Sequence, residues 1–173
     1  VVKKLTGGLA ALAKQRKVQV VTGLGRFSDT HHIEVQTADG LTRIEFEHCI
    51  IACGSTPVRI PGFPNDDPRL IDSTGALALA DIPGKLLIVG GGIIGLEMAN
   101  VYAGLGSEVD IVELQPGLMP GCDRDLVKPL QKRLEKQVSS ILLKTKVSDI
   151  KAQKNGLKVS FEGDKAPASK LYD

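Results

Sequence analysis

The sequence has few aromatic residues and little net charge. Aromatic side chains make up 3% of its 173 residues, Trp is missing altogether, and the formal net charge is +2. Nucleic-acid-binding proteins usually present a strongly basic surface, or aromatic platforms on which bases stack. We therefore expect no nucleic-acid partner for this chain.

Long apolar runs are missing as well. No run approaches the ~20 residues that a helix needs to cross a bilayer, so we expect no membrane partner. Hydrophobic residues make up 42% of the sequence and charged residues 24%, as is usual for globular proteins. A chain of this length suffices for one domain or for parts of two.

Cysteine is scarce, and the three that occur have no disulfide-framework spacing. This odd count favours a reducing, cytoplasmic setting. Cys49 and Cys53 fall in a strand-like run over residues 48–53, and we expect both to be buried free thiols, because free Cys behaves as a small hydrophobe. Cys122 lies in a polar loop. No His has a partner at metal-ligand spacing, so we expect no metal site.

A glycine-rich stretch in the middle of the chain carries the strongest pattern. Residues 86–89 form an unbroken apolar run, which is typical of a strand buried in a parallel sheet. The hexapeptide Gly90-Gly91-Gly92-Ile93-Ile94-Gly95 follows and matches G-x-G-x-x-G. Apolar residues then recur at helical spacing up to Leu105, and residues 109–113 predict a second strand that ends on Glu113.

This order of strand, glycine turn, helix, strand and acid predicts a dinucleotide site. Gly90 permits the tight turn, Gly92 leaves room for a pyrophosphate, and Gly95 lets helix and strand pack closely. The helix N-terminus offers unpaired N–H groups to the phosphates. The alternative is a glycine-rich turn of another α/β protein, with Glu113 as a solvated strand end.

The acid predicts which nucleotide binds. Glu113 lies close to the usual spacing of ~20 residues from the glycine turn, where a carboxylate accepts hydrogen bonds from the ribose hydroxyls. The same carboxylate would repel a 2′-phosphate. No Arg occurs between Glu113 and Arg124 to receive such a phosphate. The sequence therefore favours NAD over NADP.

Periodicity and turn residues predict the remaining elements. We expect helices over residues 2–17, from an N-cap at residues 72–74 through Leu79, and from Asp123 or Asp125 to about Gln137, the last containing Pro129. We expect strands over residues 18–27, 33–37, 42–46, 49–52, 141–143, 147–152 and 157–162, and the start of another at Leu171-Tyr172.

Five segments together resemble a known family. They are Leu5-Thr-Gly-Gly-Leu-Ala10, Ile50-Ile-Ala-Cys-Gly-Ser55, Ile71-Asp-Ser-Thr74, Gly90-Gly-Gly-Ile-Ile-Gly-Leu-Glu97, and Phe161-Glu-Gly163 followed by Ala166-Pro167. Over the whole chain they are similar to the bacterial dihydrolipoamide dehydrogenases, which are pyridine nucleotide-disulfide oxidoreductases.

The resemblance implies part of an α/β flavoprotein with two dinucleotide-binding domains. Residues 1–80 would be the rear part of an FAD domain, made of a helix, a β-meander and a linker. Residues 81–173 would be a Rossmann-like NAD domain with an appended β-meander, lacking its last strand. The chain would then be an internal fragment of a longer protein.

The resemblance also implies the site residues. Glu97 would lie near the nicotinamide, Ile93 would cover the flavin, and Val147 would pack on the NAD adenine. Cys53 and Pro129 depart from the family's usual residues at those positions. The full implied NAD set is Gly90, Gly91, Gly92, Ile93, Ile94, Gly95, Glu97, Glu113 and Val147, and the implied FAD set is Gly25, Ala52, Cys53, Gly54 and Ser55.

The resemblance implies an activity for the longer protein. It would oxidise dihydrolipoamide on the acyltransferase of a 2-oxo acid dehydrogenase complex, pass electrons through a redox disulfide and FAD to NAD+, and form a homodimer. The redox Cys pair and the His-Glu pair would lie outside this chain, so we expect the fragment itself to be inactive. Two alternatives are another disulfide reductase, of the mercuric or glutathione reductase type, and a non-catalytic NAD-binding module.

Overall fold

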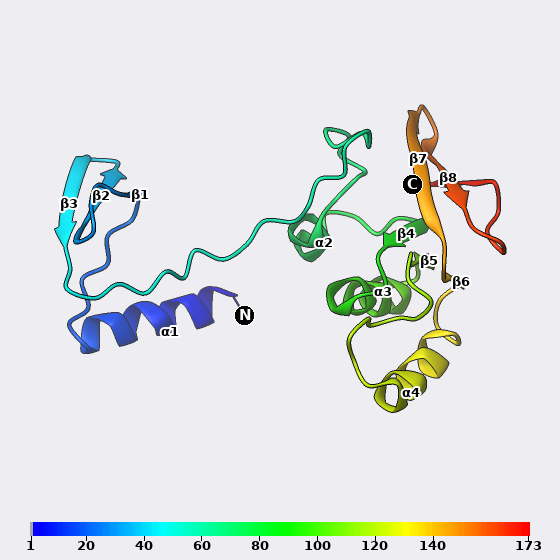
Figure 1. Cartoon of the computed structure of the whole chain (residues 1–173), viewed down its shortest axis with the longest axis horizontal. Coiled ribbons are helices and arrows are strands. Elements are labelled where there is room, and N and C mark those ends of the chain that lie inside the picture. The colour runs from blue at the N-terminus through cyan, green and yellow to red at the C-terminus, as the bar shows by residue number, and fades with distance from the viewer. Residues whose placement is uncertain (1) are drawn as a thin grey trace. The chain divides into compact units, whose positions relative to one another are not determined.

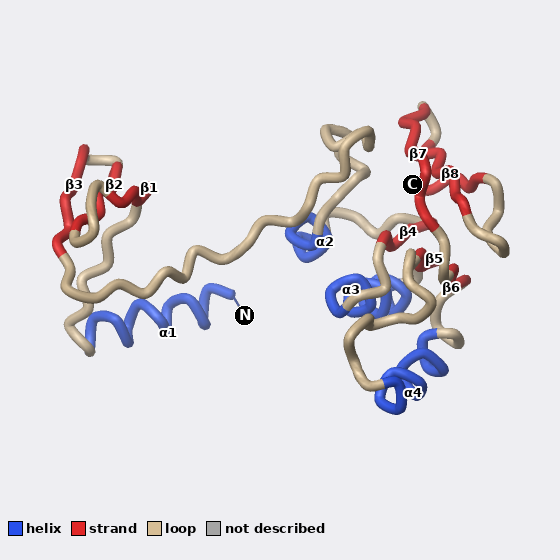
Figure 2. Tube along the Cα trace, in the orientation of Figure 1, coloured by secondary structure: helices blue, strands red, loops and turns tan. Residues whose placement is uncertain are grey.

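The computed structural model describes residues 2–173 and divides the chain into two compact units, Val1–Gly54 and Ser55–Asp173. Figure 1 labels the helices and the strands β1 to β8, and Figure 2 shows how the elements alternate with loops. Both units mix helices with sheets, and the second contains a parallel sheet. This confirms the predicted α/β class, while the domain boundary at residue 81 stays a prediction.

The first unit contains one helix and a three-stranded antiparallel sheet. The helix α1 spans Val2–Gln15, and the strands are β1 (Leu24–Phe27), β2 (His32–Thr37) and β3 (Gly40–Glu45), paired in the order β1-β2-β3. The predicted hairpin of β2 and β3 is confirmed. Its turn requires glycine, because Gly40 has a φ of +125°.

One predicted strand of this unit is wrong, and another is shorter than predicted. Residues 18–23 and 49–52 are not in strands, so of the predicted strand over residues 18–27 only β1 forms. Cys49 and Cys53 are exposed, not buried. A strand exists only when its N–H and C=O groups pair with a neighbour, and no described strand pairs with either segment.

The second unit is built on a parallel sheet. Its strands β4 (Lys85–Val89), β5 (Glu108–Val112) and β6 (Ser140–Leu142) pair in the order β4-β5-β6. The helix α3 (Ile93–Leu105) connects β4 to β5, as the sequence predicted. The core gathers apolar residues of α3, β5 and α4, among them Ala99, Ile111 and Leu134.

The second unit contains two more helices, α2 and α4, both shorter than α3. The helix α2 (Ser73–Ala78) begins where predicted, because the Asp72 carboxylate accepts the N–H groups of Thr74 at 2.9 Å and Gly75 at 3.0 Å. The helix α4 spans Arg124–Leu134 and ends before Gln137. Asp123 occupies the N-cap position, although its side chain makes no capping hydrogen bond. Because the helix begins this early, Pro129 lies inside it. Pro has no N–H, so one helical carbonyl is left without its usual donor.

A second, antiparallel sheet follows β6 in the chain. Its strands are β7 (Lys146–Gln153), β8 (Gly156–Glu162) and β9 (Ser169–Tyr172), paired in the order β7-β8-β9. The predicted Asn155-Gly156 turn is present, with Gly156 at a φ of +147°. The chain end lies beside β4, where the Asp173 N–H donates to the Lys85 carbonyl at 3.1 Å.

A buried carboxylate joins the two sheets of this unit. Asp110, on β5, is 2% exposed. It accepts hydrogen bonds from the Ser140 hydroxyl of β6 at 2.6 Å, from the Tyr172 hydroxyl of β9 at 2.8 Å, and from the Lys170 ammonium of β9. The polar groups of Asp110 are thus paired, as burial demands.

None of the helices in residues 2–173 combines the length and apolarity that crossing a membrane would require.

Candidate dinucleotide-binding site

The glycine turn between β4 and α3 adopts a backbone that other residues would disrupt. Gly90 has a φ of +112°, and its N–H donates to the Val112 carbonyl of β5 at 2.8 Å. A Cβ at Gly95 would lie 2.2 Å from the Gly90 carbonyl oxygen. These two glycines therefore have the geometry expected for a tight turn and for close packing of helix on strand.

Gly91 is equally constrained, which the motif did not indicate because it treats this position as variable. Its N–H donates to Glu113 Oε2 at 2.7 Å, and its carbonyl accepts the Met119 N–H at 2.8 Å. A Cβ here would lie 2.5 Å from Leu118 Cδ2. The Gly91 peptide is thus held between the end of β5 and the loop that follows it.

The start of α3 is open, unlike Gly91. Gly92 occupies the N-cap position, and a Cβ there would meet nothing within 4 Å. Ile93 and Ile94 are exposed. The first N–H groups of a helix have no partner within the helix and carry partial positive charge. An anionic group such as a pyrophosphate has access to these donors.

Glu113 lies directly after β5 and beside the turn. Its side chain is buried, so it is not a solvated strand end. Besides the bond from Gly91, the carboxylate accepts the Gln115 N–H at 2.7 Å. A carboxylate offers about four acceptor positions, so it retains capacity for the hydroxyls of a ribose.

Backbone bonds bring the start of β7 to the same edge of the fold. The Glu113 N–H donates to the Leu142 carbonyl at 2.8 Å, and the Glu113 carbonyl accepts the Thr145 N–H at 3.0 Å. Val147 follows two residues later on β7 and is partly buried. The structure thus gathers the glycine turn, Glu113 and the beginning of β7.

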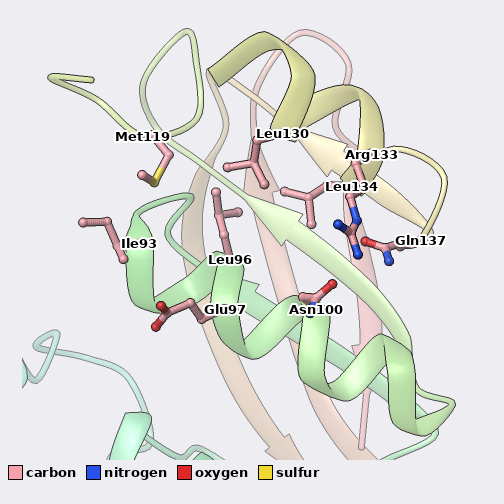
Figure 3. Close-up of a pocket in the computed structure, with 9 residues that line it drawn as sticks. All are labelled: Ile93, Leu96, Glu97, Asn100, Met119, Leu130, Arg133, Leu134 and Gln137. Atoms are coloured by element: carbon pink, nitrogen blue, oxygen red, sulfur yellow. The ribbon is translucent and has the colours of Figure 1, made fainter. Parts of the chain in front are cut away.

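A pocket of about 370 Å³ lies alongside α3 (Figure 3). Leu96, Leu130 and Leu134 form its apolar part, while Arg133 and Gln137 lie toward one end. Ile93 and Glu97 line it from the first turns of α3. Two of the predicted NAD-site residues therefore border a cavity between α3 and α4.

The predicted FAD residues lie on β1 and in the segment that follows β3. Gly25 lies on β1, where a Cβ would be 3.4 Å from Ile33 Cγ2. Ala52, Cys53, Gly54 and Ser55 are exposed in a segment without regular structure. Their role stays a prediction. Across residues 2–173, no group of three His, Cys, Asp or Glu is placed to hold a metal ion.

Two similar sequences carry the name of the same enzyme. The chain is 50% identical to the dihydrolipoyl dehydrogenase of Vibrio cholerae over 174 residues, which cover 100% of this chain and 36% of that relative. The dihydrolipoyl dehydrogenase of Haemophilus influenzae is 49% identical over the same coverage. The chain thus spans about a third of the length of the curated relatives it matches.

Solved structures show the same fold. The HOCl-induced flavoprotein disulfide reductase RclA from Escherichia coli superposes with a TM-score of 0.84 and 31% identity, covering 100% of this chain and 39% of that one. The water-forming NADH oxidase from Lactobacillus brevis, bound to NADH, superposes with a TM-score of 0.69 and 21% identity. The match covers 88% of this chain and 35% of the oxidase chain. At this identity it supports the fold alone.

Residues 1–171 match the family described as pyridine nucleotide-disulphide oxidoreductase. This match covers nearly the whole chain and agrees with the glycine turn, the parallel sheet and the similar sequences. The chain belongs to the pyridine nucleotide-disulphide oxidoreductase family.

Proposed function

We propose that this chain is the NAD-binding part, with the rear of the FAD-binding domain, of a dihydrolipoyl dehydrogenase. The complete protein would oxidise dihydrolipoamide on the acyltransferase of a 2-oxo acid dehydrogenase complex and reduce NAD+. The redox disulfide, FAD and NAD supply the electron-transfer chemistry, and the protein positions them. Two relatives at about 50% identity along this whole chain carry that enzyme's name.

One observation carries the nucleotide part of this proposal. The buried Glu113 carboxylate lies beside an open helix N-terminus, and its bond to the Gly91 N–H fixes it there. A pyrophosphate at Gly92 and the first turn of α3 would leave the adenosine ribose near Glu113. Val147, at the start of β7, would then pack on the adenine.

The remaining roles belong to the same proposal. Ile93 and Glu97 would lie on the nicotinamide side, as the resemblance to the family implies, and both border the pocket beside α3. Gly25 and the segment from Ala52 to Ser55 would contact FAD in the complete protein, with the domain boundary at residue 81. A homodimer and a cytoplasmic setting also belong to this proposal.

The test of NAD selection replaces Glu113 in the full-length enzyme. Glu113→Gln keeps an oxygen that accepts the Gly91 N–H but removes the charge. We expect NAD+ binding to weaken by ~1.5–3 kcal/mol, the worth of hydrogen bonds to a charged group. Titration with NAD+ and NADP+ measures this, and NAD+ affinity equal to wild type would refute the assignment.

Substrate assays separate the alternatives. A dihydrolipoyl dehydrogenase forms NADH from dihydrolipoamide. A mercuric or glutathione reductase would instead consume NADPH with mercuric ion or oxidised glutathione, and the lack of an Arg between Glu113 and Arg124 argues against NADPH. If none of these substrates reacts while NAD+ binds, the non-catalytic NAD-binding module is the better description.

A further inference from the structure

Arg124 binds the backbone of the loop that precedes it. Its Nη1 donates to the Leu118 carbonyl at 2.8 Å, and its Nη2 donates to the Met119 carbonyl and to the Cys122 carbonyl at 2.8 Å. Its Nε also donates to Cys122, at 3.0 Å. One guanidinium therefore serves three carbonyls, which the fixed fork of an Arg permits and the single ammonium of a Lys does not match.

The loop that Arg124 holds is the one that contacts the glycine turn. Leu118 is fully buried, and its Cδ2 occupies the space beside Gly91. The Met119 N–H donates to the Gly91 carbonyl at 2.8 Å. Because the Gly91 N–H is bound by Glu113, a continuous set of contacts runs from Arg124 through the loop and Gly91 to the Glu113 carboxylate.

Two features of the loop and of α4 are unfavourable by themselves, so other contacts must stabilise them. Met119 has a φ of +51°, in the left-handed region that non-glycine residues seldom adopt. Arg124 is the first residue of α4, where a positive charge faces the positive end of the helix dipole. The hydrogen bonds from the guanidinium to the loop carbonyls offset both.

We propose that Arg124 is a positioning residue that sets the preference for NAD over NADP. By fixing the loop from Leu118 to Cys122, it holds Gly91, and through Gly91 it aims the Glu113 carboxylate at the ribose. Its guanidinium is occupied by carbonyls and so does not receive a 2′-phosphate. This inference rests on the proposed NAD site.

The test uses the full-length flavoenzyme and three variants. Arg124→Met removes the guanidinium, and Arg124→Lys keeps the charge but not the fork. Lys128→Met, one turn further along α4 on an exposed position, makes the same charge change and is the matched control. Steady-state kinetics with dihydrolipoamide give kcat and KM for NAD+ and, separately, for NADP+. The flavin spectrum and the thermal midpoint are recorded for each variant.

We expect Arg124→Met to raise KM for NAD+ about tenfold, equivalent to about 1.4 kcal/mol, with kcat nearly unchanged. KM for NADP+ should change little, so the preference for NAD+ falls. Arg124→Lys should lie between wild type and Arg124→Met, and Lys128→Met should match wild type. If Arg124→Met does not yield flavin-loaded protein, Arg124→Lys provides the test. A rise in its KM for NAD+, with KM for NADP+ unchanged, would support the inference.

Other outcomes overturn the inference. A purely structural role would lower kcat and the thermal midpoint while leaving the NAD+ to NADP+ preference as in wild type. An unchanged KM for NAD+ in a folded Arg124→Met enzyme would also overturn the inference. If the wild-type enzyme itself does not use NAD+, the proposed function fails first, and the inference fails with it.

Discussion

Within the turn, glycines that look alike in the sequence have different surroundings. Gly95 faces the Gly90 carbonyl and Ile88, Gly91 faces Leu118 and Glu113, and Gly92 faces open space. The first two are required by packing inside the protein. Of these three glycines, only Gly92 has no neighbouring residue that a side chain would meet. The space beside its backbone is therefore free for a ligand.

This difference predicts opposite effects of two substitutions in the full-length enzyme. Gly95→Ala places a Cβ 2.2 Å from a backbone oxygen, so we expect a loss of ~1–3 kcal/mol of stability, as for overpacking. Gly92→Ser adds a side chain in open space at an N-cap position that favours Ser, so stability should hold or rise by roughly a few tenths of a kcal/mol.

NAD+ affinity separates the two variants further. Gly92→Ser should weaken NAD+ binding because its hydroxymethyl group takes the place of the pyrophosphate, while the thermal midpoint stays at or above that of wild type. Thermal melts and NAD+ titrations measure both quantities. A Gly92→Ser enzyme that binds NAD+ as wild type does would mean that the pyrophosphate lies elsewhere.

Among the elements, β5 and β9 depend on each other through Asp110. Burial alone would raise the pKa of Asp110, but hydrogen bonds from Lys170, Ser140 and Tyr172 hold it below its usual value. Burial, and then the bond to Asp110, raise the pKa of Tyr172 far above its usual value. The folded state therefore favours an ionised Asp110 and a neutral Tyr172.

The sign of the pH dependence follows from these directions. A carboxyl whose pKa is lowered by folding stabilises the protein above its unfolded-state value and loses that contribution as the pH falls through the folded-state pKa. A Tyr whose pKa is raised contributes below its unfolded-state value, and that contribution is lost as the pH rises through the folded-state pKa. Asp110 thus matters most at neutral pH and least in acid.

We expect Asp110→Asn to lower stability by ~1–3 kcal/mol at neutral pH, since it removes hydrogen bonds to a charged group. The difference from wild type should begin to shrink below about pH 4, the usual pKa of an Asp, and disappear as the pH falls through the lower folded-state pKa. Thermal midpoints across the pH range measure this. Asp149→Asn is the control, because Asp149 forms only an exposed ion pair with Lys151, worth little. A deficit that stays constant with pH would contradict the assignment.

Along the chain, segments outside the regular elements differ in how many hydrogen bonds hold them. The stretch from Phe63 to Ala76 belongs to the second unit through contacts of its own. The Arg69 guanidinium donates to the Gln153 carbonyl at 2.9 Å, and Ala76 accepts the Tyr102 hydroxyl at 2.8 Å. The segment around residues 47–58 is exposed and makes no such bonds in the described chain.

Limited proteolysis of the 173-residue chain should therefore cut first between Glu47 and Val58. Exposed segments without backbone hydrogen bonds open at little free-energy cost. We expect a resistant product that extends from this region to Asp173 and retains the parallel sheet. Mass spectrometry of a digestion series locates the cuts. Early cleavage within residues 85–162 would show that the second unit is not an independent folded body.

Short-range patterns in the sequence are enough to predict the local parts of this protein. The strand, glycine turn and helix from Lys85 to Leu105, the Asp72 cap, and the turns at Gly40 and Gly156 form as predicted. Each depends on neighbours a few residues away, on backbone conformations open only to glycine, or on apolar spacing along one element. Such causes can be read from residue order.

The remaining features depend on contacts between segments that are distant in the sequence. The segment over residues 49–52 has strand composition but no partner strand within residues 2–173, and its Cys49 is exposed. Gly91 is constrained by Leu118 and Glu113, and Asp110 is paired with residues of β6 and β9. Strand pairing and burial depend on which distant segments come together in space, and no short stretch of sequence contains that information.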